Sequence, residues 1–426
     1  SHYNNKSYTT LSFTYIDNPK GCGIESNRFW YFDNWVQWQS SINNDLKISE
    51  KIRLKTKLFY VNHNDELVDD AEKTLSFGGK SWFDRSEYNG FSYGALASTD
   101  IDLNSNNKIR LGLNYQFDNN AQKEFNTKNN AGVVINEGWS DESEYEISTL
   151  SLGTEFVTSI KNKLFITPGI SYEKFYTITV DNQSSNSSKY ELNPQIGLSY
   201  KLNENNRLYY SIGRKTRFPR MKELYSSHAG GNKNLDAERN LFNELGFESK
   251  INNITVNQTF FHNDVDNLIA RVRDNDNNWV YVNTNETRFI GSETSIDFGI
   301  TENLNAGISY SFTESKDILA DKDIQLKPKH KLNLDLNSSF NRSSFNIQGM
   351  LISDQYITYV QGGENIDRDL PSYFLMNIKY AYKMGIKNIS DITFEISIRN
   401  LFDTNYDDGA GPVSGRDIHC GTSLTF

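Results

Sequence analysis

The sequence predicts an all-β fold, a transmembrane antiparallel β-barrel, from three observations. Apolar and polar residues alternate with a period of two along many short runs, as in strands with one buried face. Aromatic residues are frequent, with 24 Tyr and 26 Phe in 426 residues, and they gather at the ends of these runs. Short and long connections alternate between the runs, which is the arrangement of transmembrane barrels.

The composition agrees with such a barrel and excludes a helical membrane protein. The mean hydropathy of −0.64 is too low for a bundle of transmembrane helices, and no stretch of about 18 apolar residues could form even one. A barrel needs apolar residues at only every second position of each strand. A large soluble β-protein has a similar composition, so the composition alone leaves both classes open.

The alternation is clearest in four runs, in which apolar residues take one face and charged or amide residues the other. Their apolar faces are Ile52, Leu54, Leu58 and Tyr60; Ile109, Leu111, Leu113, Tyr115 and Phe117; Leu332, Leu334 and Leu336; and Ile392, Phe394, Ile396 and Ile398. The aromatic residues at the ends of such runs resemble the girdles at membrane interfaces, and they favour a membrane barrel over a soluble sandwich.

The connections divide into two kinds. Short turns, rich in residues that tolerate a left-handed backbone, are expected at 43–45, 105–107, 203–206, 301–303 and 385–388. Long polar loops are expected at 64–87, 119–143, 215–239, 315–327 and 355–371. In bacterial barrels the short turns face the periplasm and the long loops face the exterior.

About eighteen strands result, and an even number is typical of single-chain bacterial barrels. The first strand covers Tyr8–Tyr15 and the last covers Asp417–Phe426, so both chain ends are expected on the periplasmic side. One barrel domain, residues 1–426, accounts for the chain. The last strand alternates and ends in Phe426, which resembles the signal that the barrel assembly machinery reads.

Charge and motifs exclude several functions. A net charge of −10 argues against nucleic-acid binding, which needs a basic surface. Cys22 and Cys420 are too few for a disulfide framework or a metal–thiolate cluster. No nucleophile elbow, phosphate loop or metalloprotease motif occurs, so neither an enzyme nor a bound cofactor is expected. The first residues do not form a signal peptide, which indicates a processed or truncated exported protein.

Three segments resemble boxes of the TonB-dependent outer-membrane receptor family. They are YYSIGRKTRFPRMKELY at 209–225, GNKNLDAER at 231–239 followed by ELGFE, and SIRNLFDTNY at 397–406. In order, they are similar to the family's Phe-Arg-Ala-Pro, Asn-Pro-Asn-Leu and Asn-Leu-Phe-Asp patterns. The second box departs from the family at Lys233 and Ala237, where the family has proline, and the first box lacks the alanine.

The resemblance implies a barrel of about 22 strands, of which about eighteen are visible, and an N-terminal plug domain that this chain does not show. It also implies an outer-membrane receptor for energised uptake of a scarce iron chelate, haem or a similar bulky nutrient. The TonB–ExbB–ExbD complex would act through the plug, and outer-membrane lipid would surround the barrel. The alternatives are a plugless, porin-like diffusion pore and an adhesive barrel whose loops bind host proteins.

The resemblance places the ligand-binding residues in the loop that contains the first two boxes. The candidates are His228, Arg217, Tyr225, Asn232 and Asn234. Haem receptors of this family carry a haem-ligating histidine in this loop, and a neutral imidazole is a competent axial ligand for haem iron. His228 is therefore the candidate metal ligand, and the competing interpretation is an ordinary loop histidine among small residues.

Two further charged groups allow more than one interpretation. The basic residues predicted to line the barrel could attract an anionic ligand or could balance neighbouring acids, and the second interpretation is favoured. These residues are Arg53, Lys55, Lys57, Arg110 and Arg214. The acidic run at 273–278 offers oxygen ligands for calcium but lacks the glycine and the bidentate glutamate of an EF-hand.

Overall fold

The computed structural model describes residues 2–4, 6–22, 28–129, 132–226, 230–273, 279–284, 286–361, 364–386, 389–408, 413 and 415–425. Most of these residues lie in strands. The two helices are short, α1 (Ala71–Ser76) and α2 (Met221–Tyr225). No helix in the described part of the chain is long and apolar enough to cross a membrane. The predicted all-β class is confirmed.

The strands pair antiparallel with their neighbours along the chain. Hydrogen bonding assigns 22 of the described strands to one sheet. Four of them, β1, β3, β8 and β19, have at most six residues. The remaining long strands agree with the predicted number of about eighteen. Clustering of contacts divides the chain into two compact units, and each is described by itself below.

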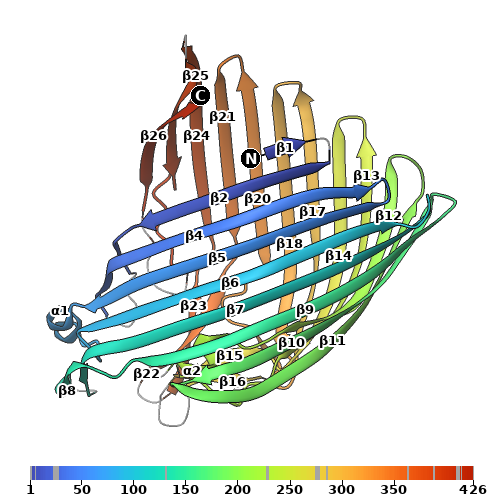
Figure 1. The fold of residues 1–426 in the computed structure, drawn as a ribbon. Coiled ribbons are helices and arrows are strands. Elements are labelled where there is room, and N and C mark those ends of the chain that lie inside the picture. The colour runs from blue at the N-terminus through green and yellow to red at the C-terminus, as the bar shows by residue number, and fades with distance from the viewer. Residues whose placement is uncertain are drawn as a thin grey trace. The chain divides into compact units, whose positions relative to one another are not determined.

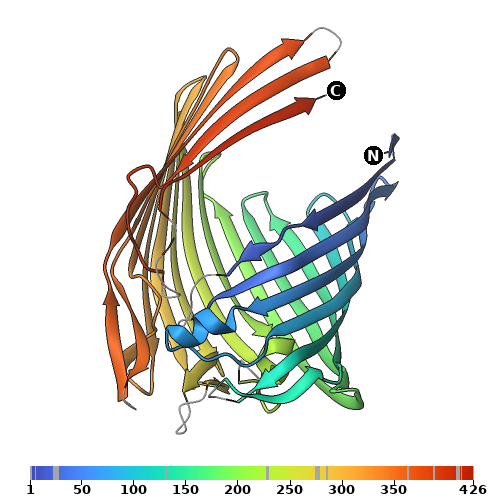
Figure 2. The same ribbon diagram turned by 90° about the vertical axis from the view of Figure 1, so that its left-hand side faces the viewer.

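Unit 1 comprises Ser1–Ile196 and Thr216–Leu235. Its strands are β1 (His2–Asn4), β2 (Ser7–Asp17), β3 (Lys20–Gly21), β4 (Trp30–Ser49), β5 (Ile52–Asp69), β6 (Arg85–Asp102), β7 (Asn107–Lys128), β8 (Val134–Trp139), β9 (Ser143–Ile160), β10 (Leu164–Val180) and most of β11 (Gln183–Lys201). The long strands from β2 to β10 pair in chain order (Figure 1). Helix α1 lies at the loop ends of these strands (Figure 2).

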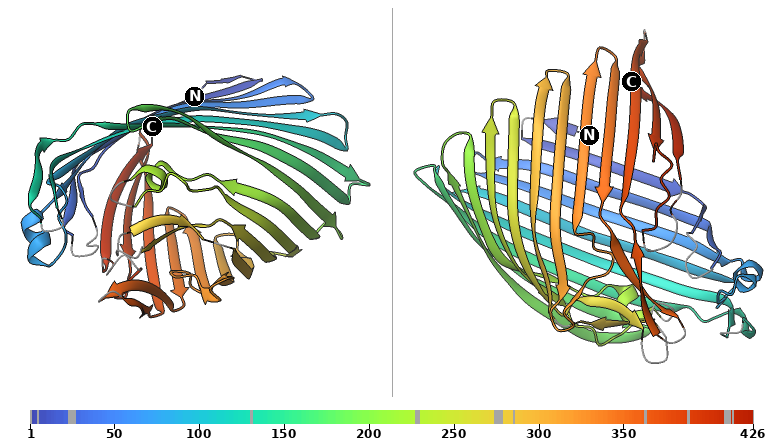
Figure 3. Two further views of the ribbon diagram at one scale, coloured as in Figure 1. Left: turned by 90° about the horizontal axis from the view of Figure 1, so that it is seen from below. Right: turned by 180° about the vertical axis from the view of Figure 1, so that it is seen from behind.

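Unit 2 comprises Gly197–Lys215 and Asp236–Phe426. Its strands are most of β12 (Asn206–Arg217), then β13 (Glu238–Ile251), β14 (Ile254–Asp266), β15 (Ile269–Arg273), β16 (Trp279–Asn283), β17 (Thr287–Thr301), β18 (Leu304–Asp317), β19 (Lys322–Asp323), β20 (His330–Phe340), β21 (Ser343–Ile352), β22 (Gln355–Gln361), β23 (Glu364–Leu370), β24 (Tyr373–Ile386), β25 (Ile389–Arg399) and β26 (Asp417–Thr425). Two loop hairpins, β15–β16 and β22–β23, form separate two-stranded sheets. The green to red strands follow one another in chain order (Figure 3, right).

The sheet of unit 1 has one apolar face and one charged face. Leu111, Leu113, Leu152 and Phe156 keep 39–43% of their surface exposed, and Leu113 lies directly opposite Leu152 in the register. A continuous face of exposed large apolar side chains is unfavourable in water and is the lipid-facing side of a membrane barrel. We call this the outer face, and the opposite side the inner face.

Charged residues on the inner face form ion pairs across the strands. The two guanidinium hydrogen bonds from Arg53 to Asp45 measure 2.7 Å each. Arg110 lies 3.4 Å from Asp100 and 3.6 Å from Glu155. For these two arginines the favoured interpretation, charge balance, is confirmed.

Aromatic rings on the outer face stack across β4 to β7. Ring centroids are 4.9 Å apart for Trp38 and Tyr60, 6.0 Å for Tyr60 and Phe91, and 4.9 Å for Tyr93 and Phe117. We call these five residues the aromatic ladder. It lies on the loop side of the apolar residues, as a membrane-interface girdle does.

The structure corrects one predicted turn. Residues 43–45 lie inside β4, and the turn follows at Glu50 and Lys51. Asn44 is satisfied within the sheet, because its side-chain amide donates to Ser7 Oγ and Thr9 Oγ1 at 3.0 and 2.7 Å. An asparagine that bonds across strands has no need of a turn.

Other predicted features are confirmed or extended. The turns at 105–107, 203–206 and 301–303 fall between consecutive strands, whereas 385–388 lies partly outside the described residues. The loops predicted at 64–87 and 119–143 are shorter, because β5 and β7 continue into them. Cys22 and Cys420 are both free thiols. The prediction of one barrel domain over 1–426 stays a prediction.

Candidate functional site

The second half of the first box, residues 216–225, folds into a short segment of unit 1 that is held by one carboxylate. The strand residue Arg217 donates to both oxygens of Glu223, at 3.1 and 2.9 Å. The backbone N–H of Arg220 donates to the same carboxylate at 2.8 Å, just before α2 begins. Pro219 precedes this helix start and cannot continue the strand pairing. One glutamate therefore joins the strand end to the helix.

Two aromatic stacks attach this segment to the inner face of β9 and β10. Tyr225 stacks on Tyr145 with ring centroids 5.2 Å apart, and Phe218 stacks on Phe175 at 5.4 Å. Each pair contributes about 0.5–1.5 kcal/mol beyond its buried area. The Tyr225 hydroxyl also donates to Thr177 Oγ1 at 3.4 Å.

The second box supports helix α2 through two backbone hydrogen bonds. The Gly231 N–H donates to Ser226 O at 2.7 Å, and the Asn232 N–H donates to Glu223 O at 2.8 Å. A Cβ on Gly231 would lie 2.6 Å from Ser226 N and 2.8 Å from Tyr225 N. Only glycine fits against this backbone, so the box positions α2.

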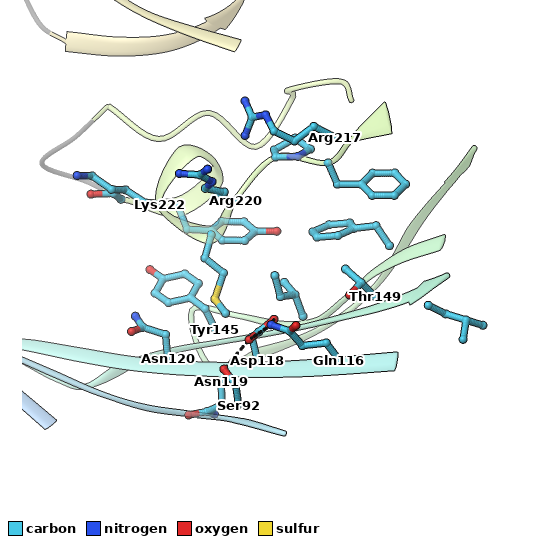
Figure 4. A pocket seen from close by; sticks show the side chains of 18 of the residues that line it. Ser92, Gln116, Asp118, Asn119, Asn120, Tyr145, Thr149, Arg217, Arg220 and Lys222 are labelled. Atoms are coloured by element: carbon cyan, nitrogen blue, oxygen red, sulfur yellow. Dashed lines mark hydrogen bonds between the residues drawn. The ribbon is translucent and has the colours of Figure 1, made fainter. Parts of the chain in front are cut away.

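Between this segment and the inner face lies a cavity of about 760 Å³. Arg217, Arg220 and Lys222 lie on the side of α2, and Ser92, Gln116 and Asp118 lie across from them (Figure 4). The four stacked aromatic rings and Ile147, Leu150 and Met221 supply its apolar surface. The cavity size is within the usual range for small-molecule sites, about 300–1,000 Å³.

The cavity has a positive side and, across from it, a carboxylate that accepts hydrogen bonds from neutral groups. Asp118 accepts hydrogen bonds from Ser92 at 2.5 Å and from Gln116 at 2.8 Å. Arg220 and Lys222 are exposed, and no carboxylate of the described residues lies within ion-pair distance of either. Burial raises the pKa of the Tyr225 phenol, against a smaller lowering by its bond to Thr177. Tyr225 is therefore a neutral hydroxyl near pH 7.

The predicted ligand-binding residues divide into three groups. Arg217 and Tyr225 line the cavity. Asn232 and Asn234 are not among its lining residues, and the Asn234 N–H donates to Asn232 Oδ1 at 3.0 Å in a local turn. His228 lies outside the described residues, so its proposed bond to haem iron stays a prediction.

Sequence reasoning missed Arg220 and Lys222, although both lie inside the first box. It also missed the opposite wall, where Gln116, Asp118 and Thr149 face the cavity. Their alternation on β7 and β9 was visible in the sequence. Which stretch of the inner face α2 covers was not visible, because that depends on tertiary packing.

The third box, residues 397–406, has a structural role in unit 2. The Asn400 side chain donates to Thr404 O and accepts from the Thr404 N–H, both at 2.9 Å. Asn400 and Asp403 have φ of 50° and 55°, a left-handed backbone that asparagine and aspartate tolerate. Asp403 also accepts from the Arg416 N–H at 2.7 Å. This box closes a loop.

Metal ligation finds no support in the described part of the chain. No group of three or more His, Cys, Asp or Glu residues there could hold a metal ion. The calcium interpretation concerned 273–278, and 274–278 lie outside the described residues.

Comparison with known proteins gives a consistent family. A family model described as TonB dependent receptor-like, beta-barrel matches residues 1–401. The iron-regulated outer membrane virulence protein of Vibrio cholerae serotype O1 is 26% identical over 219 residues, which cover 46% of this chain and 32% of that protein. The match spans about one third of this curated relative's length.

Solved structures share the fold at low identity. The copper transporter OprC has a TM-score of 0.76 at 12% identity, over 99% of this chain and 70% of that chain. The FrpB iron transporter from Neisseria meningitidis (F3-3 variant) has a TM-score of 0.74 at 15% identity, over 98% and 69%. The ferripyoverdine receptor of the outer membrane of Pseudomonas aeruginosa has a TM-score of 0.72 at 12% identity, over 99% and 63%.

Proposed function

Because the chain belongs to the TonB dependent receptor-like, beta-barrel family, we propose that it forms the barrel of a receptor that takes up an anionic metal chelate. Outer-membrane residence comes with the family. Iron-regulated, iron-transporting and ferripyoverdine-binding relatives support a ferric chelate as the ligand. Energised release through TonB, ExbB and ExbD and a periplasmic position of both chain ends are part of the proposal.

The cavity under α2 is the observation that carries it. Arg220 and Lys222 offer positive charge to an anion, and charge-assisted hydrogen bonds are about twice as strong as neutral ones. The stacked pairs Tyr145–Tyr225 and Phe175–Phe218 offer flat apolar surface beside these charges. A ferric catecholate combines negative charge with aromatic rings, so it fits both features.

The proposed action changes no covalent bond. The loop side binds the chelate, the cations neutralise its charge, and the aromatic rings exclude water from its flat surface. Haem is a second ligand of similar size with carboxylate groups, and His228 would be its axial ligand. The binding test below includes haemin for this reason.

The test measures binding of a ferric chelate to the purified full-length protein. Equilibrium dialysis with the radiolabelled iron complex of 2,3-dihydroxybenzoate is expected to show saturable binding. The double variant Arg220→Gln/Lys222→Gln should bind about tenfold or more weakly, because each lost charged hydrogen bond costs about 1.5–3 kcal/mol. Lys233→Gln is the matched control, since Lys233 does not line the cavity.

Three results would contradict the proposal in different ways. Equal binding by the double variant and the unmodified protein would show that the ligand does not bind in this cavity. Tight haemin binding that is lost in His228→Ala, with no binding of the ferric catecholate, would show that the ligand is haem and not a ferric catecholate. Open-channel conductance of the full-length protein without any saturable binding would favour the diffusion pore.

A further inference from the structure

The outer face of unit 1 continues well beyond the aromatic ladder on the loop side. Tyr60 of the ladder and Val68 lie on the same face of β5, because they are an even number of positions apart. At about 3.3 Å per residue they are roughly 26 Å apart along the strand. A strand tilted by about 45° therefore rises roughly 19 Å above the ladder, whereas phospholipid headgroups add only about 5–8 Å to each side of the hydrocarbon core. This part of the face stands above any phospholipid.

A row of directly opposed residues crosses the outer face at this height, from β4 to β8. It runs Tyr31, Val68, Arg85, Phe125 and Trp139. We call it the upper row. Tyr31 and Trp139 each keep 42% of their surface exposed, and Arg85 is exposed between them. The sheet therefore presents two aromatic side chains and one guanidinium group on one line.

Contacts with its neighbours hold Trp139 in place. Its ring centroid lies 5.3 Å from that of Phe125, and the Lys123 ammonium lies 4.8 Å from the centroid of the indole. These contacts orient the ring, while much of its surface stays open. An oriented indole offers a flat apolar surface with a polar N–H at its edge. The C–H faces of sugar rings pack on such surfaces.

The outer face between the ladder and the upper row is polar. Arg85 lies 2.5 Å from Glu66, and Lys123 lies 2.9 Å from Glu87, so the charges of these four residues balance. The strip from β5 to β7 that carries them also has three amide side chains on the same face, Asn62, Asn64 and Asn89. We call this the polar strip. It offers many hydrogen-bond donors and acceptors, as the hydroxyl groups of a sugar require.

We propose that the upper row and the polar strip bind the sugar chain of a glycolipid in the outer leaflet of the membrane. The acyl chains would lie on the apolar face below the ladder, and the sugars would follow the strip up to Trp139. A membrane lipid is the occupant because the site continues the membrane interface along the same strands. A lipid phosphate alone fits less well, since Arg85 and Lys123 already pair with carboxylates.

The first test compares three probes that differ in the sugar. Rough lipopolysaccharide carries a short core of sugars on lipid A, and the other two probes are lipid A alone and the free core oligosaccharide. Microscale thermophoresis measures their affinity for the purified full-length protein in detergent. Rough lipopolysaccharide is expected to bind about tenfold more tightly than lipid A, and the free core more weakly than either, because the two parts of the lipid bind together.

Variants locate the sugar contact. Trp139→Ala should bind rough lipopolysaccharide about fivefold more weakly, because a stacking surface is lost, and should keep its affinity for lipid A. Trp139→Tyr retains a flat ring and should restore most of the binding. Tyr31→Ala tests the other end of the upper row without touching β8. The matched control is Phe77→Ala, because Phe77 is also exposed and stacked on one ring, that of Phe29 at 5.2 Å, but lies outside the row.

A second measurement places the lipid in the membrane itself. In intact outer membranes, Trp139→p-benzoylphenylalanine is expected to form a lipopolysaccharide adduct on irradiation, visible as a mass shift of the protein. The same photoreactive residue in place of Phe77 should form none. This experiment involves no iron chelate, so its result is independent of binding under α2.

Each result has one meaning. Equal affinity for rough lipopolysaccharide and lipid A, or normal binding by both Trp139→Ala and Tyr31→Ala, would overturn the proposal. Free core that binds as tightly as the whole lipid would make the upper row a site for soluble saccharides and would overturn the lipid as occupant. A protein adduct at Trp139 in place of the lipid adduct would assign the row to a protein partner.

Discussion

The two units build their loop sides differently. In unit 1, β4, β5, β6, β7, β9, β10 and β11 have between 17 and 22 residues. In unit 2, the main-sheet strands from β13 to β26 have 15 or fewer. Unit 1 extends its main sheet, whereas unit 2 adds the separate hairpins β15–β16 and β22–β23.

The difference shows where a rigid binding wall comes from. A tilted strand needs only about 9–11 residues to cross a membrane. From Phe117 in the aromatic ladder, β7 continues to Lys128, roughly 35 Å at about 3.3 Å per residue. The cavity under α2 uses this extension, because Asp118, Asn120 and Gln122 belong to it. The hairpins β15–β16 and β22–β23 of unit 2 are separate two-stranded sheets, so they provide no comparable wall.

The largest expected effect comes from breaking the extension. Ala121 lies in β7 between Asn89 and Glu144 and pairs on both sides. Ala121→Pro should disrupt the pairing on both sides of β7, since proline removes a ladder hydrogen bond and is tolerated only on edge strands or at bulges. Hydrogen exchange is expected to rise at the loop ends of β6, β7 and β9, with loss of chelate binding.

The matching change in unit 2 is Ile357→Pro in the hairpin β22–β23, where Ile357 pairs only with Arg368. Exchange should rise within that hairpin alone, and chelate binding should stay normal. If Ala121→Pro also raised exchange only locally, the extension would not be one cooperative wall, and the comparison would fail.

A smaller effect is expected at Gly231, which packs against helix α2 beside the cavity. Gly231→Ala places a Cβ 2.6 Å from Ser226 N, so α2 must shift. Overpacking of this kind costs about 1–3 kcal/mol, and chelate affinity should fall with it. In unit 2, the nearest atom to a Cβ on Gly299 is 3.5 Å away, so Gly299→Ala should change stability by about 0.5 kcal/mol or less. Thermal unfolding and dialysis measure both, and equal effects would remove the special role of Gly231.

The smallest effect is a pH dependence of the loop attachments. Burial raises the pKa of Asp84, but hydrogen bonds from Lys128 and Asn126 outweigh it and lower that pKa below its usual value. A carboxyl with a lowered pKa stabilises the fold above its unfolded pKa of about 3.9. This contribution is lost as the pH falls through the lower folded pKa.

In unit 2, hydrogen bonds from Thr358 and Lys322 lower the pKa of Asp367 in the same way. Asp84→Asn should cost about 1 kcal/mol at pH 7, after allowance for solvent screening, and Asp367→Asn should cost less because Asp367 is exposed. The difference in melting temperature between Asp84→Asn and the unmodified protein should be smaller at pH 3 than at pH 7. An equal difference in melting temperature at pH 7 and pH 3 would show that the ion pair of Asp84 with Lys128 is not the cause of the destabilisation.

Much of the fold was predictable because sheet periodicity is a local signal. Leu111 and Leu113 alternate with polar neighbours, and both lie on the exposed apolar face. The turn at 43–45 failed because Asn44 resembles a turn residue by type, while its partners Ser7 and Thr9 are distant in the sequence. Strand ends were placed too early for a similar reason, since polar residues of β5 and β7 resemble loop residues.

The site was predictable only in part. The first box identified Arg217 and Tyr225, which line the cavity. The second box suggested Asn232 and Asn234 as contacts, but there the backbone of Gly231 and Asn232 supports α2. A motif records which residues recur, and it does not distinguish a side chain that touches ligand from one that shapes a turn. That distinction required the packing of α2 on β9 and β10.

The aromatic ladder also allows its depth in the membrane to be measured by fluorescence quenching. Trp38 stacks on Tyr60 with ring centroids 4.9 Å apart, at the loop-side edge of the apolar face. Brominated acyl chains quench indole fluorescence only at short range, so lipids brominated at successive carbons would report the depth of Trp38 in a variant whose other five tryptophans are replaced by phenylalanine. The same reading would fix how far β4 to β7 rise above the bilayer, without any ligand or label on the protein.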